Sequence, residues 1–206
     1  MRTDVGVRLT PFFVSKVVTN NTMAASISIR AATATDAAAI TAIYNQGIAE
    51  RAATFETEPR RVETIFERLA DARYPVLVAT EERAVLGWAG LSSYRPRDCY
   101  AGIAEFSIYL DTAARGRGLG RQLLTALVDV ATDRGYWKLV SRIFPFNTAS
   151  RALCRSCGFR EVGTYEKHAQ LDGHWLDVVI VERLIPTAIA GDAGRTLMDR
   201  EERHVS

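Results

Sequence analysis

The sequence predicts an α+β fold in which helices flank one mixed central sheet. Seven apolar-rich segments have the length of strands, and four others place apolar residues at helical spacing. Their order is strand, two helices, three strands, helix, strand, helix and two strands. The helix that follows the strand at 104–110 leads directly to the strand at 137–143, and such a crossover makes those two strands parallel neighbours. A chain of 206 residues, 48% of them hydrophobic, is long enough for one such domain.

The first half of the domain contains a strand, two helices and a hairpin. Thr35 or Asp36 can cap the first helix, because both side chains accept hydrogen bonds from a helix N-terminus. The second helix follows Pro59, and the polar residues 81–83 form the turn of the hairpin. The predicted elements are a strand at 27–30, helices at 39–48 and 62–69, and strands at 74–79 and 85–91.

The second half alternates strands and helices before it ends in two strands. Gly135 and Gly158 each follow a helical run, where a residue with a left-handed backbone commonly ends a helix. The predicted elements are strands at 104–110, 137–143, 159–165 and 175–184, and helices at 119–131 and 148–157.

The two ends differ from this alternating pattern. Residues 1–26 lack a long apolar core and have Asn20-Asn-Thr22 where a signal peptide would carry small residues, so we expect a disordered extension or a non-native start. Residues 187–206 are predicted to be a loose tail, which leaves 27–186 as the domain. No run approaches ~18 apolar residues, so no membrane partner is predicted.

Charge and cysteine content narrow the class of protein. A formal charge of +2 does not favour nucleic acid as a partner. Three cysteines are too few for a disulfide framework and suit a cytoplasmic protein. Cys154-x-x-Cys157 lacks a second pair of ligands, and the histidines show no ligand spacing, so no metal site is predicted.

The stretch Arg115-Gly-Arg-Gly-Leu-Gly120 is the strongest functional signal in the chain. It lies between a predicted strand and a predicted helix, where unpaired backbone N–H groups and the helix dipole favour an anion such as a pyrophosphate. Gly116, Gly118 and Gly120 permit left-handed dihedrals and close approach of ligand oxygens. The alternative is a tight turn with a solvated basic rim. The stretch lacks the features of a Walker loop and of a dinucleotide fingerprint.

With this element order, the sequence resembles the GNAT family of acetyl-CoA-dependent N-acetyltransferases. That family's Arg/Gln-x-x-Gly-x-Gly/Ala signature is matched by Arg115, Gly118 and Gly120. A second signature, an Asn that opens the next helix and a Gly-aromatic pair that ends it, is matched by Asn147 and by Gly158-Phe159. The resemblance covers roughly residues 27–186.

Within that family the chain is most similar to enzymes that acetylate the α-amine of phosphinothricin, methionine sulfoximine or arsinothricin. The resemblance implies the same activity here, conferring resistance to an antibiotic amino acid, and a homodimer. Another small amine, a protein N-terminus, or a catalytically silent acyl-CoA-binding module are the alternatives. The matching strings are Ile43-Tyr-Asn45, Thr54-Phe55, Thr57-Glu-Pro59, Tyr94-Arg-Pro96, Ser107-Ile-Tyr109 and Gly173-His-Trp-Leu-Asp177.

The resemblance also implies where acetyl-CoA binds. The cofactor would lie in a splay between the parallel strands 104–110 and 137–143, with its extended pantetheine arm paired to strand backbone. Asn147 would contact that arm, cap its helix, or do both. The residues expected to bind acetyl-CoA are Ile108, Tyr109, Leu110, Gly116, Arg117, Gly118, Leu119, Gly120, Arg121 and Asn147.

Glu105 is the candidate catalytic residue. An amine must lose a proton to attack a thioester, and Glu105 is the one carboxylate on the strand expected to pass the thioester. An ordinary carboxyl pKa suits a base poorly, so partial burial or a bridging water is expected, and a structural ion pair with an arginine is the alternative. Related enzymes place Tyr or His as thiolate proton donor where this chain has Cys154, which we expect to serve mainly in packing; Tyr109 is a second candidate.

The substrate is expected to be a small anionic amino acid. Arg95 and Arg97 occupy positions where the resembling enzymes bind that substrate, and a guanidinium fork suits carboxylate, phosphinate or arsinate groups. A solvated Arg97 is the alternative, and His174 is a further candidate contact. The related pattern has Thr where this chain has Ile103, which removes a polar contact near the substrate.

Overall fold

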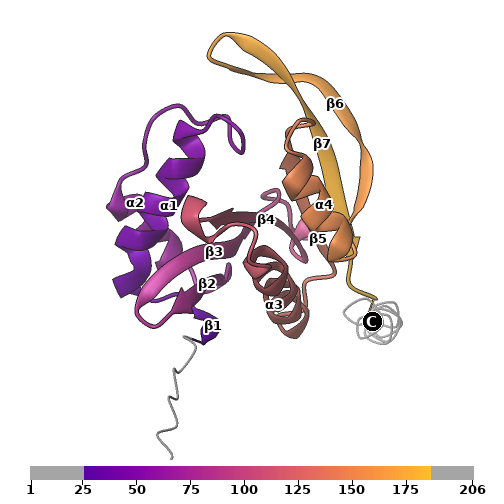
Figure 1. The fold of residues 1–206 in the computed structure, drawn as a ribbon. Coiled ribbons are helices and arrows are strands. Elements are labelled where there is room, and N and C mark those ends of the chain that lie inside the picture. The colour runs from indigo at the N-terminus through magenta and orange to yellow at the C-terminus, as the bar shows by residue number, and fades with distance from the viewer. Residues whose placement is uncertain (1–25, 187–206) are drawn as a thin grey trace, which may run out of the picture.

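The computed structural model of the chain describes residues 26–186. It contains one seven-stranded mixed sheet in the order β1-β2-β3-β4-β5-β7-β6. The extension predicted within 1–26 lies, except for residue 26, outside the described residues, and so does the predicted tail at 187–206. The elements, labelled in Figure 1, are β1 (Ile27–Ala31), α1 (Ala37–Ala49), α2 (Val62–Ala70), β2 (Val76–Glu81), β3 (Ala84–Ser93), β4 (Ile103–Leu110), α3 (Leu119–Asp133), β5 (Lys138–Ile143), α4 (Thr148–Ser156), β6 (Arg160–Leu171) and β7 (His174–Leu184).

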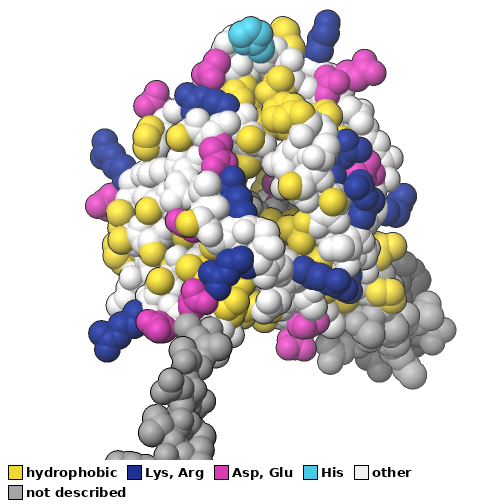
Figure 2. Space-filling model, in the orientation of Figure 1, with side chains coloured by type: hydrophobic (Ala, Val, Ile, Leu, Met, Phe, Trp, Pro, Cys, Tyr) yellow, Lys and Arg dark blue, Asp and Glu magenta, His cyan; other side chains and the backbone are white. Residues whose placement is uncertain are grey.

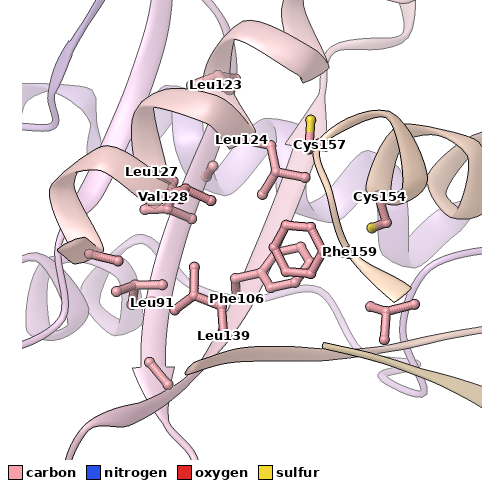
Figure 3. Packing of buried hydrophobic residues seen from close by; sticks show 14 of the residues in the cluster. Leu91, Phe106, Leu123, Leu124, Leu127, Val128, Leu139, Cys154, Cys157 and Phe159 are labelled. Carbon is pink, nitrogen blue, oxygen red and sulfur yellow. The ribbon is translucent and has the colours of Figure 1, made fainter. Parts of the chain in front are cut away.

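Helices cover both faces of the sheet because its central strands are apolar on both sides. Leu77 and Ala79 of β2 pack in the cluster that includes α3, whereas the alternate residues Val76 and Val78 pack against α1 and α2. The α3 cluster is the larger core, and in Figure 3 the ring of Phe106 lies near that of Phe159, with centroids 4.8 Å apart. The α+β class, the mixed sheet and all seven strands are therefore confirmed.

Two local predictions needed correction. The last hairpin is longer than the predicted strands at 159–165 and 175–184, and in Figure 1 it projects well beyond α4. Its first strand is exposed along most of its length, so the sequence there has no apolar alternation to reveal it.

At the start of α1, the Asp36 carboxylate does not cap the helix; it accepts from the Thr33 N–H (2.7 Å) and pairs with Arg30.

No helix within residues 26–186 has the length and apolar character needed to cross a membrane. In the same part of the chain, no group of three or more His, Cys, Asp or Glu side chains is arranged to hold a metal ion.

Candidate active site

The sheet divides between β4 and β5. These parallel strands pair only at Ile103↔Lys138, Ala104↔Leu139 and Glu105↔Val140, after which β4 pairs with β3 alone and β5 continues beside β7. The Ser141 hydroxyl donates to the Phe106 carbonyl (3.0 Å) where the strands separate. The predicted splay is therefore present, and the strand edges beyond it offer unpaired N–H and C=O groups to an extended ligand.

A cavity of about 520 Å³, called the loop cavity below, lies between the end of β4 and the start of α4. Gly116 and Gly118 adopt φ of 76° and 77°, and a Cβ at either position would meet nothing within 4 Å, so the glycines serve backbone conformation. Nine of the ten residues predicted to bind acetyl-CoA line this cavity. They are Ile108, Tyr109, Leu110, Gly116, Gly118, Leu119, Gly120, Arg121 and Asn147.

The tenth, Arg117, does not line the loop cavity. Its guanidinium pairs with Glu81 at the end of β2, which directs the side chain elsewhere. Arg115 does line the cavity and is held by Glu50 at 2.9 Å. The positive charge of this loop is therefore partly neutralised by neighbouring carboxylates, and the groups available to an anion are the backbone N–H groups of the glycine turn and Arg121, which lines the cavity.

Asn147 caps α4 and also holds the loop after α1. Its side-chain oxygen accepts from the Ser150 N–H, and its amide donates to the Ala52 carbonyl, both at 3.0 Å. Since Ala52 and Asn147 both line the loop cavity, this one side chain joins its two walls. The predicted cap is confirmed, and the contact with a pantetheine arm stays a prediction.

Tyr109 belongs to an aromatic cluster rather than to the reacting region alone. Its ring stacks on Trp88 (5.2 Å) and meets Tyr44 edge to face (4.7 Å). A Cβ on Gly47 would lie 2.7 Å from the Tyr109 ring, so only glycine lets α1 approach this closely. Burial, with a smaller contribution from Tyr44, raises the pKa of Tyr109, which makes it a weak proton donor to a thiolate.

Glu105 faces two further cavities, at the point where β4 and β5 separate. The central cavity, about 400 Å³, extends from Glu105 to Cys154, and the hairpin cavity, about 570 Å³, extends from Glu105 to Tyr165 on β6. Figure 2 shows the middle of this face hollowed between the α1–α2 side and the α4–β7 side. Burial raises the pKa of Glu105 despite the opposing influence of Arg142, which favours its use as a base.

Arg142 of β5 is a site residue that the sequence analysis missed. Its guanidinium donates to both carboxylate oxygens of Glu105, and both residues line both cavities. The alternative considered for Glu105, an ion pair with an arginine, is thus present at a carboxylate that also faces the cavities. Sequence spacing gives little sign of this pair, because the partners lie on separate strands.

The two predicted substrate arginines differ in position. Arg95 lines the hairpin cavity, and its guanidinium lies 5.2 Å from the ring of Tyr94 and 5.9 Å from that of Tyr100. Arg97 is exposed and lines neither the central nor the hairpin cavity. Its carbonyl accepts from the Tyr100 N–H (2.9 Å), so the residue begins a turn, and its predicted substrate contact is not supported by this geometry.

The histidine that lines the central and hairpin cavities is His168 and not the predicted His174. His174 is the first residue of β7, next to the hairpin turn, where its Nδ1 contacts the Asp172 carbonyl (3.0 Å), and it lines neither the central nor the hairpin cavity. His168, on β6, lines both. Because the strand predicted at 159–165 ended before residue 168, His168 was not expected to lie at the site.

Cys154 lies at the inner end of the central cavity and is buried in the main core, with Cys157 nearby in Figure 3. Burial raises the pKa of the Cys154 thiol to about 12. A thiol this weakly acidic would give up a proton to a departing thiolate only against an unfavourable difference in pKa. The structure therefore favours the packing role.

The arrangement of the three cavities is suited to a group-transfer enzyme. A glycine turn suited to phosphates leads along open strand edges to a partly buried carboxylate, and a separate cavity reaches that carboxylate from the side of the β6–β7 hairpin. Such a layout lets a long carrier molecule and a small acceptor meet at one point.

Comparison with known proteins identifies the class. Residues 26–160 match the acetyltransferase (GNAT) domain family. An L-methionine sulfoximine/L-methionine sulfone acetyltransferase of Pseudomonas aeruginosa is 36% identical over 170 residues, which cover 80% of this chain and 99% of the relative. The chain therefore belongs to the GNAT family of acetyltransferases.

Two solved structures have the same fold. A phosphinothricin acetyltransferase from Sinorhizobium meliloti, in complex with AcCoA, matches with a TM-score of 0.73 and 34% identity over 77% of this chain and 88% of that one. A ribosomal-protein-alanine N-acetyltransferase from Brucella melitensis matches with a TM-score of 0.74 and 35% identity over 77% and 99%. The two proteins are about equally similar to this chain, but their names specify different acceptors of the acetyl group.

Proposed function

We propose that this protein transfers the acetyl group of acetyl-CoA to the α-amine of a small anionic amino acid of the phosphinothricin, methionine sulfoximine or arsinothricin type. The observation that carries the proposal is the position of Glu105, which faces the central and hairpin cavities beside Arg142, with Arg95 in the hairpin cavity. One carboxylate and two guanidinium groups suit a molecule with one amine, a carboxylate and the phosphinate or arsinate of phosphinothricin or arsinothricin; in methionine sulfoximine the sulfoximine oxygen would accept hydrogen bonds in place of the second acidic group.

The loop cavity fits the donor. Its glycine turn and the N-terminus of α3 would hold the pyrophosphate of acetyl-CoA, and the open edge of β4 around Ile108 would pair with the pantetheine amides. A backbone N–H of this edge that is not paired with pantetheine would stabilise the negative charge that develops on the carbonyl oxygen during attack. Acetyl-CoA supplies the activated acetyl group.

The acceptor amine is the group that must change its protonation state. At neutral pH it is an ammonium ion, and Glu105 would accept its proton, directly or through a water, because the raised pKa of this carboxyl makes it a stronger base. Ile103, which replaces the Thr of the related pattern, lines the hairpin cavity and favours acceptors with an apolar portion there. Capping the amine would remove the positive charge of the amino acid.

A panel of acceptors tests this proposal. The protein is incubated with acetyl-CoA and, in turn, phosphinothricin, methionine sulfoximine, arsinothricin, a polyamine and a peptide with an N-terminal alanine, and released CoA is measured. We expect turnover with at least one of the three amino-acid analogues and none with the peptide. Turnover of the peptide alone would assign the acceptor named for the Brucella melitensis relative instead.

The homodimer and the cytoplasmic location stay predictions. Sedimentation equilibrium of the full chain tests the first, with a mass of twice 22.8 kDa as the expected result.

A further inference from the structure

Arg68 on α2 is half-buried, its Nε is inaccessible to solvent, and its positive charge has no carboxylate partner among residues 26–186. Its Nη2 donates to the Leu91 carbonyl (3.2 Å), and its guanidinium lies 5.1 Å from the ring of Trp88. Both contacts are favourable but neither neutralises the charge. Burial lowers the pKa of Arg68, which reflects the cost of keeping that charge away from water.

Two hydrogen-bond donors at this position have no acceptor. In the described part of the chain, Arg68 Nε and Trp88 Nε1 are the buried side-chain nitrogen or oxygen atoms without a hydrogen-bond partner. Trp88 itself is only 1% exposed. Buried donors are nearly always satisfied in folded proteins, so two such atoms at one place indicate an acceptor that is not part of the protein.

Both residues line the same small cavity. Its volume is about 140 Å³, and Tyr44, Arg60, Thr64 and Ile65 complete its wall. Gly90 leaves space beside it, since a Cβ at that position would lie 3.2 Å from Arg68 Nη2 and 3.0 Å from a methyl group of Val76. Arg60 is already matched by two hydrogen bonds to Glu56, so the uncompensated charge at the cavity is that of Arg68.

We propose that this cavity binds one small monovalent anion, a halide ion such as chloride. One negative charge balances the single free guanidinium, and a divalent anion would bring an unmatched charge into a buried space. An ion of this size fits the cavity, and the two residues that carry the unpaired N–H groups, Arg68 and Trp88, both line it. Tyr44 lines both this cavity and the central cavity, whereas the loop and hairpin cavities share no lining residue with it.

Thermal unfolding of the full chain in sodium chloride and in sodium gluconate of equal ionic strength measures the binding. A ligand at ten times its dissociation constant should raise the Tm by about 3–6 °C for a domain of this size, with a saturating dependence on chloride. Arg68→Met should abolish the difference between the two salts. Arg61→Met, which removes an exposed arginine next to the same helix, should preserve it. Equal Tm values of the wild type in both salts would overturn the proposal.

Crystals soaked in sodium bromide locate the ion without relying on a variant that folds. We expect one anomalous peak in the cavity, within hydrogen-bond distance of Arg68 Nε and Trp88 Nε1. Water alone in the cavity at high bromide contradicts the proposal. Trp88→Phe keeps a ring beneath the guanidinium but removes the N–H, and it should weaken chloride binding about tenfold, the loss of one hydrogen bond to a charged group.

Discussion

The loop cavity and the hairpin cavity approach the same region of the sheet but are made of different parts of the chain. The loop cavity also takes residues from 47–53 and 146–153, but the parts of it suited to acetyl-CoA are the glycine turn at 115–121, apart from Arg117, and the open edge of β4, which would bind through their backbone. The hairpin cavity is formed by side chains from four segments, among them Arg95, Arg142 and His168. A backbone site is encoded locally, by glycines at fixed spacing, whereas a side-chain site depends on how distant segments pack.

This contrast predicts that substitutions on the two sides change different quantities. Changes at the glycine turn should alter acetyl-CoA affinity, and changes around Glu105 should alter the rate and its dependence on pH.

Glu105→Gln should have the largest effect. The amide cannot accept the proton of the amine, so kcat should fall at least tenfold and on the order of 10²-fold, while the Kd for acetyl-CoA changes less than twofold. Glu56→Gln is the matched control, since its carboxylate lines the same central cavity but is committed to Arg60, which lowers its pKa. We expect it to lose no more than threefold. An unchanged rate for Glu105→Gln would rule out the assigned base.

Gly118→Ala should weaken acetyl-CoA binding about tenfold, as measured by calorimetry. The residue has φ of 77° at the start of α3, and an alanine there either bears about 1–2 kcal/mol of left-handed strain or moves the turn. Gly135→Ala imposes the same strain just after the other end of α3, with φ of 79°, and should destabilise the protein without changing acetyl-CoA affinity. Equal affinities for the two variants would mean that the turn does not hold the cofactor.

Arg142→Met should move the acidic limb of the kcat/KM profile to higher pH. Glu105 is active when deprotonated, so activity is lost as the pH falls through its pKa, and the Arg142 charge lowers that pKa. Without this charge the pKa rises further, and kcat/KM at pH 7 should fall about fivefold. Arg142→Lys keeps the charge and should keep the limb near its wild-type position. A limb that does not move would mean that Arg142 acts on substrate binding alone.

Asn147→Ala should lower stability by about 1 kcal/mol, because α4 loses its cap, and should raise the KM for acetyl-CoA about threefold. Asn147→Asp keeps the acceptor for the Ser150 N–H but loses the donor to the Ala52 carbonyl. We therefore expect it to keep the Tm and to share the higher KM. Denaturation curves and initial rates separate the two roles, and a normal KM for the Asp variant would leave Asn147 as a cap only.

Cys154→Ala should have the smallest effect, with kcat changed less than twofold. The thiol is buried and its raised pKa makes it a poor proton donor. A tenfold loss of kcat in a variant with a normal Tm would restore Cys154 as the group that protonates the leaving thiolate.

The sequence predicted the fold and most of the loop cavity because both depend on local patterns. The glycines at 116, 118 and 120, the Asn147 cap and the parallel crossover each have a signal that lies within a few residues. Arg142 was missed because its meaning comes from a partner 37 residues away on a neighbouring strand. His168 was missed because β6 is exposed along most of its length, so no apolar alternation marked the strand. The substrate contact of Arg97 stays a prediction, and the turn that this residue begins had no signal in the sequence pattern.

The fork between β4 and β5 places two sheet edges inside the molecule, where most proteins have a continuous ladder. Exposed strand edges ordinarily pair with strands of other chains. Here the flanking helices leave only a narrow cavity beside the edges, which is wide enough for an extended small molecule but not for another strand. Pantetheine bound as proposed would pair with β4, so the backbone amide hydrogens of that strand should exchange more slowly when acetyl-CoA is bound. The place where β4 and β5 separate would thus be both the binding site of acetyl-CoA and the part of the sheet that unfolds first.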